Sequence, residues 1–397
     1  MKEKYTLAMI ADIHLGVMNS ERQKQELESC FFHDLDKMDE LDAIIILGDL
    51  YDKKIYLNDR TTSVAIWFYN RMIGIARKNH SKIRIIYGTK SHEADQYNLI
   101  DQIPLYDVDI SIIHTVQEET LFEGVNVLYL PEEHMYSKLD YYEHFLYNDE
   151  NIEKYQYIFG HGIIDGIMKI PDKKEDSKKL HVPRFTVGEL MNVSCGEIYF
   201  GHYHVHSSYD ARNFIGYVGS FNRWIFGEEE AKGYMISTYK PEKEKFSNKF
   251  IENTMADKYH TFYYEYDSYI YEDEENLLKE FKKIESLIDN DVYQKIRLMI
   301  SIPENLENTE FYITAFKEKF KFNNHVKIEF KNGYIEKHRM VDKETADDVY
   351  EKYGFITNRN LELEDITSRF IEEKQHVNIP KERVRKYMNA KTLSDVL

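Results

Sequence analysis

Hydrophobic residues occur in this chain mainly as short, nearly continuous runs that end at glycine or at a cluster of polar residues. The first such runs are 4–12, 41–52 and 82–88. Their aliphatic content is typical of strands that are buried on both faces of a sheet. Two segments with helical spacing of apolar residues, 20–38 and 58–79, separate the runs, and Ser20 is the expected N-cap of the first helix. This alternation predicts an α/β fold with covered sheet faces.

Further strands are expected beyond residue 100. They are 109–114, 125–130, 155–162, 196–204 and 214–220. Most of them also end in a glycine or a polar cluster. In sheets of this kind, ligand chemistry gathers just beyond the strand ends, where several loops converge.

The pattern changes after about residue 240. Two helical and three strand-like segments predict a compact βαβαβ unit over 257–340, and the pattern becomes helical over 341–397, with a break at Asn378-Ile379-Pro380. We therefore predict three domains, at 1–240, 257–340 and 341–397.

Composition narrows the class of protein. Hydrophobic residues make up 42% of the 397 residues, so a packed core is available. No apolar stretch reaches the length of about 18 residues that a membrane helix needs, and the N-terminal apolar run is too short for a signal peptide. The two cysteines, Cys30 and Cys195, lie far apart, which favours a reducing cytoplasm over a disulfide framework.

The net charge of −18 argues against a nucleic-acid partner at first sight. Bound divalent cations would offset the charge of several carboxylates locally, so the net charge does not exclude a nucleic-acid partner. The basic segments 172–180 and 331–339 could contact a polyanion or could be solvated surface.

Side chains suited to metal binding follow many of the predicted strands. They are Asp12, His14, Asp49, Asp52, Ser91, His92, His161, His202 and His204. His202 and His204 alternate along an extended segment and therefore point the same way. Each pair or motif alone is common, but their recurrence at successive strand ends predicts a metal site. A mixture of imidazole and carboxylate suits Mn²⁺, Fe²⁺ or Zn²⁺, and two ions about 3.5–4 Å apart suit phosphoryl displacement.

Five segments, in this order, resemble the motifs of calcineurin-like metallophosphoesterases. They are "ADIHLG" (11–16), "GDLYD" (48–52), "GTKSHE" (88–93), "GHG" (160–162) and "GHYHVH" (201–206). Within that superfamily, the chain resembles the SbcD-type DNA repair nucleases and their phage relatives. "ADIHLG" and "YVGSFNRWIFGEEEAKGY" (217–234) carry this narrower resemblance.

The resemblance implies a β-sandwich flanked by helices and a role for each motif residue. Asp12, His14, Asp49 and His204 would hold one metal ion. Asp49, His161 and His202 would hold the other. His92 would face the phosphate without binding metal, and Asp52 would orient a ligand histidine or cap its loop.

The segment "GTKSHE" departs from the family pattern, which has glycine, asparagine and histidine in succession, with the asparagine oxygen on the second metal. Here Ser91 stands directly before His92 and is the expected replacement, while Thr89 is the competing candidate. A hydroxyl is a weaker neutral ligand than an amide oxygen.

The resemblance further implies a two-metal DNA exonuclease and endonuclease that uses Mn²⁺, with Mg²⁺ as an alternative. The domain at 257–340 would place DNA ends, single- or double-stranded, over the site. The helices at 341–397 would bind an SbcC-type coiled-coil ATPase, and the nuclease would act as a homodimer in the cytoplasm, that of the host if phage-encoded. Two alternatives stay open: a phosphoesterase for small phosphodiesters or phosphoproteins, and a DNA-end-binding subunit that has lost the second metal.

Overall fold

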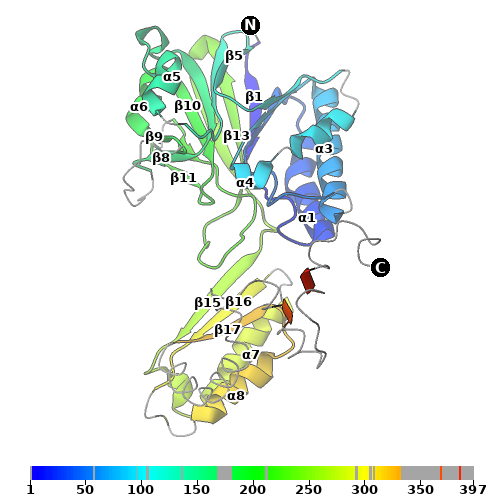
Figure 1. Cartoon of the computed structure of the whole chain (residues 1–397), viewed down its shortest axis with the longest axis vertical. Helices are drawn as coiled ribbons and strands as arrows, with labels where there is room; N and C mark the ends of the chain where they lie inside the picture. Colours follow the sequence, from blue (N-terminus) through cyan, green and yellow to red (C-terminus); the bar gives the residue numbers. More distant parts are fainter. Residues whose placement is uncertain are drawn as a thin grey trace. The chain divides into compact units, whose positions relative to one another are not determined.

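The structure is a computed structural model. It describes residues 2–56, 59–94, 96–103, 107–135, 137–167, 181–210, 213–290, 294–303, 306, 309–331, 367–368 and 384–385. The chain divides into two compact units (Figure 1): unit 1 is Met1–Thr261 with Leu287–Ile296, and unit 2 is Phe262–Ser286 with Arg297–Leu397. The predicted helical segment 341–397 lies outside the described residues apart from 367–368 and 384–385, as do the basic segments 172–180 and 332–339.

The first sheet of unit 1 has six strands in the order β14-β13-β1-β2-β3-β4. They are β1 Tyr5–Ile10, β2 Ala43–Leu47, β3 Lys82–Ile86, β4 Ile110–Ile113, β13 Gly233–Lys240 and β14 Lys245–Glu252. Strands β1 to β4 pair in parallel, and β13 and β14 are antiparallel additions next to β1. The carboxyl ends of β1, β2 and β3 therefore lie at the same edge of this sheet.

The second sheet also has six strands, in the order β11-β12-β10-β7-β6-β5. They are β5 Gln117–Phe122, β6 Val125–Leu130, β7 Tyr155–His161, β10 Ser194–Gly201, β11 Ser207–Ser208 and β12 Ile215–Tyr217. Strands β6, β7, β10 and β12 are parallel to one another, and β5 and β11 are antiparallel additions at the two edges. The pair β8 Ile163–Asp165 and β9 Arg184–Thr186 forms a small separate sheet.

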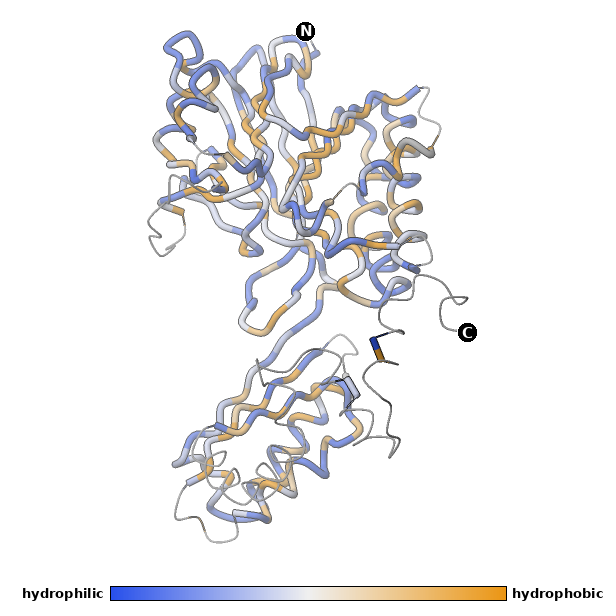
Figure 2. The backbone as a smooth tube through the Cα atoms, in the orientation of Figure 1, coloured by the Kyte–Doolittle hydropathy of each residue, from blue (hydrophilic) through white to orange (hydrophobic). Residues whose placement is uncertain are grey.

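The two large sheets pack face to face. Met9 and Ile45 of the first sheet share one core with Tyr129, Phe159 and Tyr199 of the second. Helices α1 and α3 cover the outer face of the first sheet, and α5 and α6 cover the outer face of the second (Figure 1). Figure 2 shows the hydrophobic stretches concentrated in these strands and helices. The predicted α/β class, a sandwich of two sheets flanked by helices, is confirmed.

Four helices of unit 1, namely α1, α3, α5 and α6, begin at side-chain caps. Helix α1 is Ser20–Leu27, followed by a π-helical turn at Glu28–Phe32 and α2 at His33–Asp36. The predicted cap Ser20 is wrong, because the Oδ1 of Asn19 accepts the main-chain N–H groups of Glu21 and Arg22. The remaining α-helices are α3 Arg60–Asn79, α4 Lys90–Glu93, α5 Lys138–Leu146 and α6 Val187–Val193, with 3₁₀ turns at Gln96–Gln102, Asp149–Asn151 and Pro241–Lys243.

The βαβαβ pattern predicted after residue 257 is present. Its elements are β15 Lys258–Tyr264, a 3₁₀ turn at Tyr269–Tyr271, α7 Glu274–Asn290, β16 Gln294–Ile300, α8 Thr309–Phe320 and β17 Val326–Phe330. The strands form one sheet in the order β15-β16-β17. Phe316 of α8 packs against Tyr264 and Phe281. Across the described ranges, no helix has the length and apolar content needed to cross a bilayer.

Candidate metal centre

Six parallel strand ends, three from each sheet, supply the side chains of one site. The loops after β1, β2 and β3 carry Asp12 and His14, then Asp49, then Thr89 and His92. The loops after β6, β7 and β10 contribute Glu132, then His161 at the end of β7, then His202 and His204. Because the sheets pack face to face with these ends at the same edge, residues up to 190 positions apart in sequence come into contact.

Three of these residues, Asp12, His14 and His204, form what we call the first subsite; Glu132, His161 and His202 form the second subsite. Within each group the potential ligand atoms lie within 4.8 Å of one another. Asp49 lies within the same distance of His14 and His92 and also of Asp12 and His161, and it therefore stands between the subsites. This is the arrangement of a candidate dinuclear metal centre.

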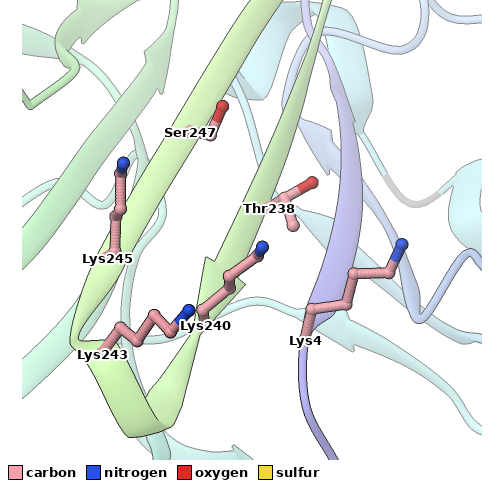
Figure 3. Close-up of a pocket in the computed structure, with 6 residues that line it drawn as sticks. All are labelled: Lys4, Thr238, Lys240, Lys243, Lys245 and Ser247. Carbon is pink, nitrogen blue, oxygen red and sulfur yellow. The ribbon is translucent and has the colours of Figure 1, made fainter.

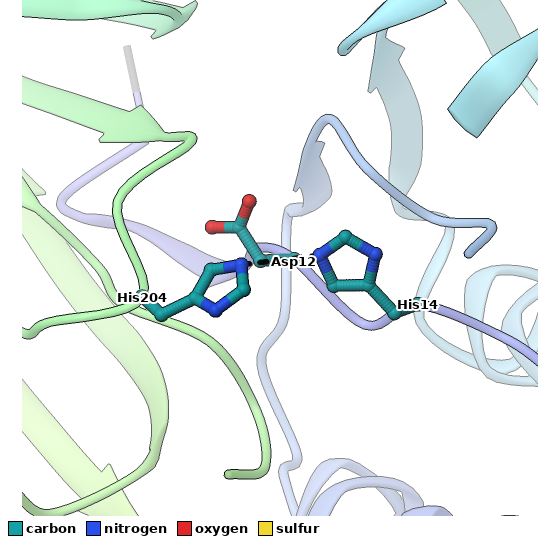
Figure 4. A group of neighbouring side chains, drawn as sticks. All are labelled: Asp12, His14 and His204. Carbon is teal, nitrogen blue, oxygen red and sulfur yellow. Dashed lines mark hydrogen bonds between the residues drawn. The ribbon is translucent and has the colours of Figure 1, made fainter. Parts of the chain in front are cut away.

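In the first subsite, the imidazole rings of His14 and His204 point toward each other beside the buried carboxylate of Asp12 (Figure 4). The Nε2 atoms of His14 and His204 are 3.2 Å apart. Two nitrogen ligands at about 2.1 Å from one ion and roughly at right angles lie about 3 Å apart, so this spacing fits a shared cation. Burial lowers the pKa of His14 to about 3, which leaves its ring neutral and able to bind metal.

Neighbouring groups orient the first subsite. Glu228 accepts a hydrogen bond from Nδ1 of His204 over 2.8 Å, which leaves Nε2 of His204 facing His14. Burial favours the neutral ring of His204, but Glu228 and Asp12 outweigh it and raise the pKa of His204. The main-chain N–H of His202 donates to both carboxylate oxygens of Asp12, over 3.0 and 3.2 Å.

The second subsite places buried acids around His161. The Nε2 of His161 lies 3.4 Å from Oδ2 of Asp49 and 3.9 Å from Oε2 of Glu132, while its Nδ1 donates to the carbonyl of Leu47 over 2.7 Å. Burial alone would lower the pKa of His161, yet Asp49, Asp12 and Glu132 raise it to about 10. The carboxylates thus attract positive charge to the point that Nε2 faces. A divalent cation meets the same demand, so the residues fit a metal ion.

The backbone at the site is strained. The φ angles of Asp12, His14, Asp49 and His202 are 49°, 49°, 48° and 97°, in the left-handed region that non-glycine residues seldom adopt. Such conformations cluster at functional sites, where the surrounding structure holds them. Glycine allows the strand ends to approach closely: a Cβ at Gly201 would lie 2.1 Å from the carbonyl oxygen of Leu47 and 2.9 Å from Nδ1 of His161.

His92 projects from the one-turn helix α4 toward the first subsite, with its ring centroid 4.9 Å from that of His14. Its Nδ1 hydrogen-bonds to the main-chain carbonyl of Asp52. Asp52 thus lies where the sequence suggested, but its main-chain oxygen makes the contact and the partner is His92.

The structure brings together seven of the residues singled out in the sequence, but not Ser91. The seven are Asp12, His14, Asp49, His92, His161, His202 and His204. Ser91 is exposed on α4. Thr89 takes that place, with Oγ1 3.3 Å from Oδ2 of Asp49 and 3.5 Å from Nε2 of His161.

The sequence reasoning missed Glu132 and Glu228. Glu132 and Glu133 follow the end of β6, so the strand-end argument used for the other ligands would have found this pair without choosing between its members. Glu228 belongs to the segment "YVGSFNRWIFGEEEAKGY", but nothing in that segment shows which of its three glutamates meets a histidine.

A separate basic hollow of about 450 Å³ lies in unit 1 (Figure 3). Its lining residues are Lys4, Thr238, Lys240, Lys243, Lys245 and Ser247. Lys4 precedes β1 and Asp12 follows its other end, so the hollow lies away from the metal centre. Its lining contains no carboxylate or imidazole.

Comparison with known proteins does not establish a family. No protein-family model matches the sequence, and no curated protein matches it. One solved crystal structure aligns over 100% of its own length with 63% of this chain, at 11% identity and a TM-score of 0.34. A likeness this weak decides nothing, so the functional argument rests on the geometry of the site.

Proposed function

We propose that this chain is a dinuclear, metal-dependent phosphodiesterase that cleaves DNA, a member of the calcineurin-like superfamily of SbcD type. The observation that carries the proposal is the position of Asp49 between two ligand groups, the first drawn from loops of both sheets and the second from loops of the second sheet. One carboxylate placed in this way can bind two ions, one through each oxygen. An isolated structural metal site needs no such sharing.

The ligands divide between two ions. Asp12, His14 and His204 would hold the first ion, His161 and His202 the second, and Asp49 both. When bound, two divalent cations, Mn²⁺ or Mg²⁺, would lower the pKa of a water molecule and would neutralise charge on the phosphoryl oxygens. The mixture of buried carboxylates and imidazoles suits Mn²⁺ well.

His92 would donate a proton to the leaving group. Its Nδ1 is engaged by the carbonyl of Asp52, so Nε2 is the ring atom free to face the substrate. In the protonated ring, Nε2–H would donate its proton to the departing oxygen of the phosphodiester. The exposed side chains of Lys53, Lys54 and Lys90 belong to the two loops that carry Asp52 and His92, where they could contact the phosphates of a polyanion.

DNA as the substrate is supported by the resemblance of the five motifs and of residues 217–234 to SbcD-type nucleases. On the same resemblance we propose action at single- or double-stranded DNA ends, a homodimer, and an SbcC-type ATPase partner, in the cytoplasm.

The test is release of nucleotides from end-labelled linear duplex DNA by the purified chain in Mn²⁺, with Mg²⁺ and chelator as controls. Release that depends on Mn²⁺ is expected. Turnover of small phosphodiesters or phosphopeptides without cleavage of DNA would overturn the assigned substrate. Metal-loaded protein that binds DNA and the ATPase but cleaves nothing would overturn the assigned activity.

A further inference from the structure

The second subsite contains a carboxylate where the resemblance expects a neutral amide. Glu132 leaves the end of β6, and its main-chain N–H donates to the carbonyl of Tyr87 over 3.1 Å. This bond holds Glu132 beside the end of β3, where the segment "GTKSHE" begins. The residue is only 5% exposed. A buried carboxylate requires partners, because an isolated charge away from water is costly.

Oε2 of Glu132 makes three contacts within the site. Oε2 lies 3.2 Å from Oγ1 of Thr89, 3.4 Å from Nδ1 of His202 and 3.9 Å from Nε2 of His161. The three partners come from three different loops. Oε2 therefore lies among the donor atoms of the second subsite, at the separations expected for ligands of one shared ion.

The adjacent carboxylate has a different environment. Glu133 accepts hydrogen bonds from the hydroxyl of Tyr141 over 2.5 Å and from the main-chain N–H of Val116 over 3.1 Å. Both of its oxygens are thus used within the fold. The contrast singles out Glu132 and provides a matched control one residue away.

We propose that Glu132 binds the second metal ion, with the hydroxyl of Thr89 beside it, in place of the asparagine amide that the family pattern has. The inference rests on the proposed dinuclear centre and extends it. Asp12, Asp49 and Glu132 then supply three negative charges to two divalent cations. An anionic oxygen holds a hard cation more strongly than a neutral hydroxyl does. Loss of the asparagine therefore does not empty the second subsite.

The experiment counts metal ions in the absence of substrate. Metal-free wild-type protein, Glu132→Gln and Glu133→Gln are dialysed against a series of Mn²⁺ concentrations, and bound Mn²⁺ is measured by mass spectrometry. We expect two ions per chain for the wild type and for Glu133→Gln. For Glu132→Gln we expect one tightly bound ion and an affinity for the second ion that is lowered about 10- to 100-fold.

Electron paramagnetic resonance gives a second readout. Wild type and Glu133→Gln loaded with Mn²⁺ should show the spectrum of two coupled ions, whereas Glu132→Gln at one equivalent should show that of an isolated ion. Circular dichroism of the metal-free proteins checks that Glu132→Gln is folded.

The outcomes separate this inference from the proposed function. Two equally tight ions in Glu132→Gln and in the wild type would overturn the role of Glu132 and leave the dinuclear centre standing. A wild-type chain that binds no Mn²⁺ would overturn both. A wild-type chain that binds one ion, with Glu132→Gln unchanged from it, would overturn the second subsite itself.

Discussion

Main-chain carbonyl groups, as well as neighbouring side chains, determine the orientation of the histidine rings in this protein. The carbonyl of Asp52 orients the ring of His92, and the carbonyl of Leu47 fixes the tautomer of His161. In both rings one nitrogen is thereby engaged and the other is directed toward the site. Substitution of such a histidine removes the ring and leaves the orienting group unchanged, which makes single-residue tests informative.

His92→Ala should keep both metal ions and lose most DNA cleavage. A positioned proton donor contributes roughly 100- to 10,000-fold in rate, so a loss of that size is expected. End-labelled DNA cleavage and the Mn²⁺ count are measured on the same preparation. His33→Ala, on the exposed surface of α2, is the control and should cleave normally. Loss of a metal ion in His92→Ala would show that His92 is a ligand and not the proton donor.

Glu26 makes stability depend on pH. Burial raises its pKa to about 7, against the lowering effect of hydrogen bonds from Asn253 and Asn222. Between its ordinary value of 4.5 and about 7, the folded chain holds a proton that the unfolded chain has released. Stability therefore falls as pH rises through this window, by up to about 3 kcal/mol.

Glu26→Gln should show a flatter dependence of unfolding free energy on pH over that window, whatever its absolute stability. Urea unfolding at pH 5 and pH 8 measures the difference. Glu21→Gln, on the exposed side of the same helix, should follow the wild type. Parallel curves for Glu26→Gln and the wild type would show that Glu26 does not control this pH dependence.

At the scale of secondary-structure elements, the site depends on how closely two sheets approach at their strand ends. The end of β10 passes against the end of β2, and glycine at position 201 leaves room for the carbonyl of Leu47 and the ring of His161. The sandwich core behind this contact is closely packed with aromatic rings such as Tyr157, Phe159 and Tyr199. A shift of one sheet edge would therefore displace ligands of both subsites.

Gly201→Ala should destabilise the fold and weaken binding of the metal ion in the second subsite. The added methyl group would lie 2.1 Å from a main-chain oxygen, so one strand end must move. We expect a loss of about 3 kcal/mol in unfolding free energy. Gly74→Ala is the control: Gly74 lies in α3, no atom beyond its own helical turns lies within 4 Å of the new methyl group, and the variant should gain up to about 1 kcal/mol. Wild-type stability and metal binding in Gly201→Ala would contradict the close approach.

At the scale of the whole molecule, electrostatics favour a chain that binds cations. The net charge is −18, and three carboxylates, those of Asp12, Asp49 and Glu132, are buried within one centre. Like charges at such short separation oppose folding unless protons or metal ions offset them. The native state should therefore bind divalent ions far more strongly than the unfolded chain, which couples metal binding to stability.

Mn²⁺ should raise the thermal unfolding temperature, and chelator should lower it. An ion at 100 times its dissociation constant adds about 2.7 kcal/mol for each independent site. Differential scanning fluorimetry across a Mn²⁺ series measures the shift. Asp49→Asn, which removes the charge shared by the subsites, should lose most of it. An unfolding temperature that stays constant up to saturating Mn²⁺ would contradict the metal centre.

The sequence did not predict β5, β8, β9, β11, β13 and β14, or the helices α4, α5 and α6. By itself it did predict the other strands of the two large sheets, the helical segments at 20–38 and 58–79, the βαβαβ unit and seven residues of the site. This was possible because apolar runs and helical spacing are local properties, and because ligands such as Asp12, Asp49 and His161 directly follow a strand or end one. The division into domains at 1–240, 257–340 and 341–397 stays a prediction, as do DNA, the ATPase and the homodimer.

Only the tertiary structure decided between residues that look alike in the sequence. Nothing in "LPEEH" distinguishes Glu132 from Glu133, but the parallel pairing of β6 with β7 places Glu132 beside His161. Likewise, the turn of α4 exposes Ser91, while Thr89, which precedes it, contacts Asp49. Strand pairing joins segments far apart in sequence, so the partner of a side chain depends on the packing of the two sheets and not on its neighbours in the chain.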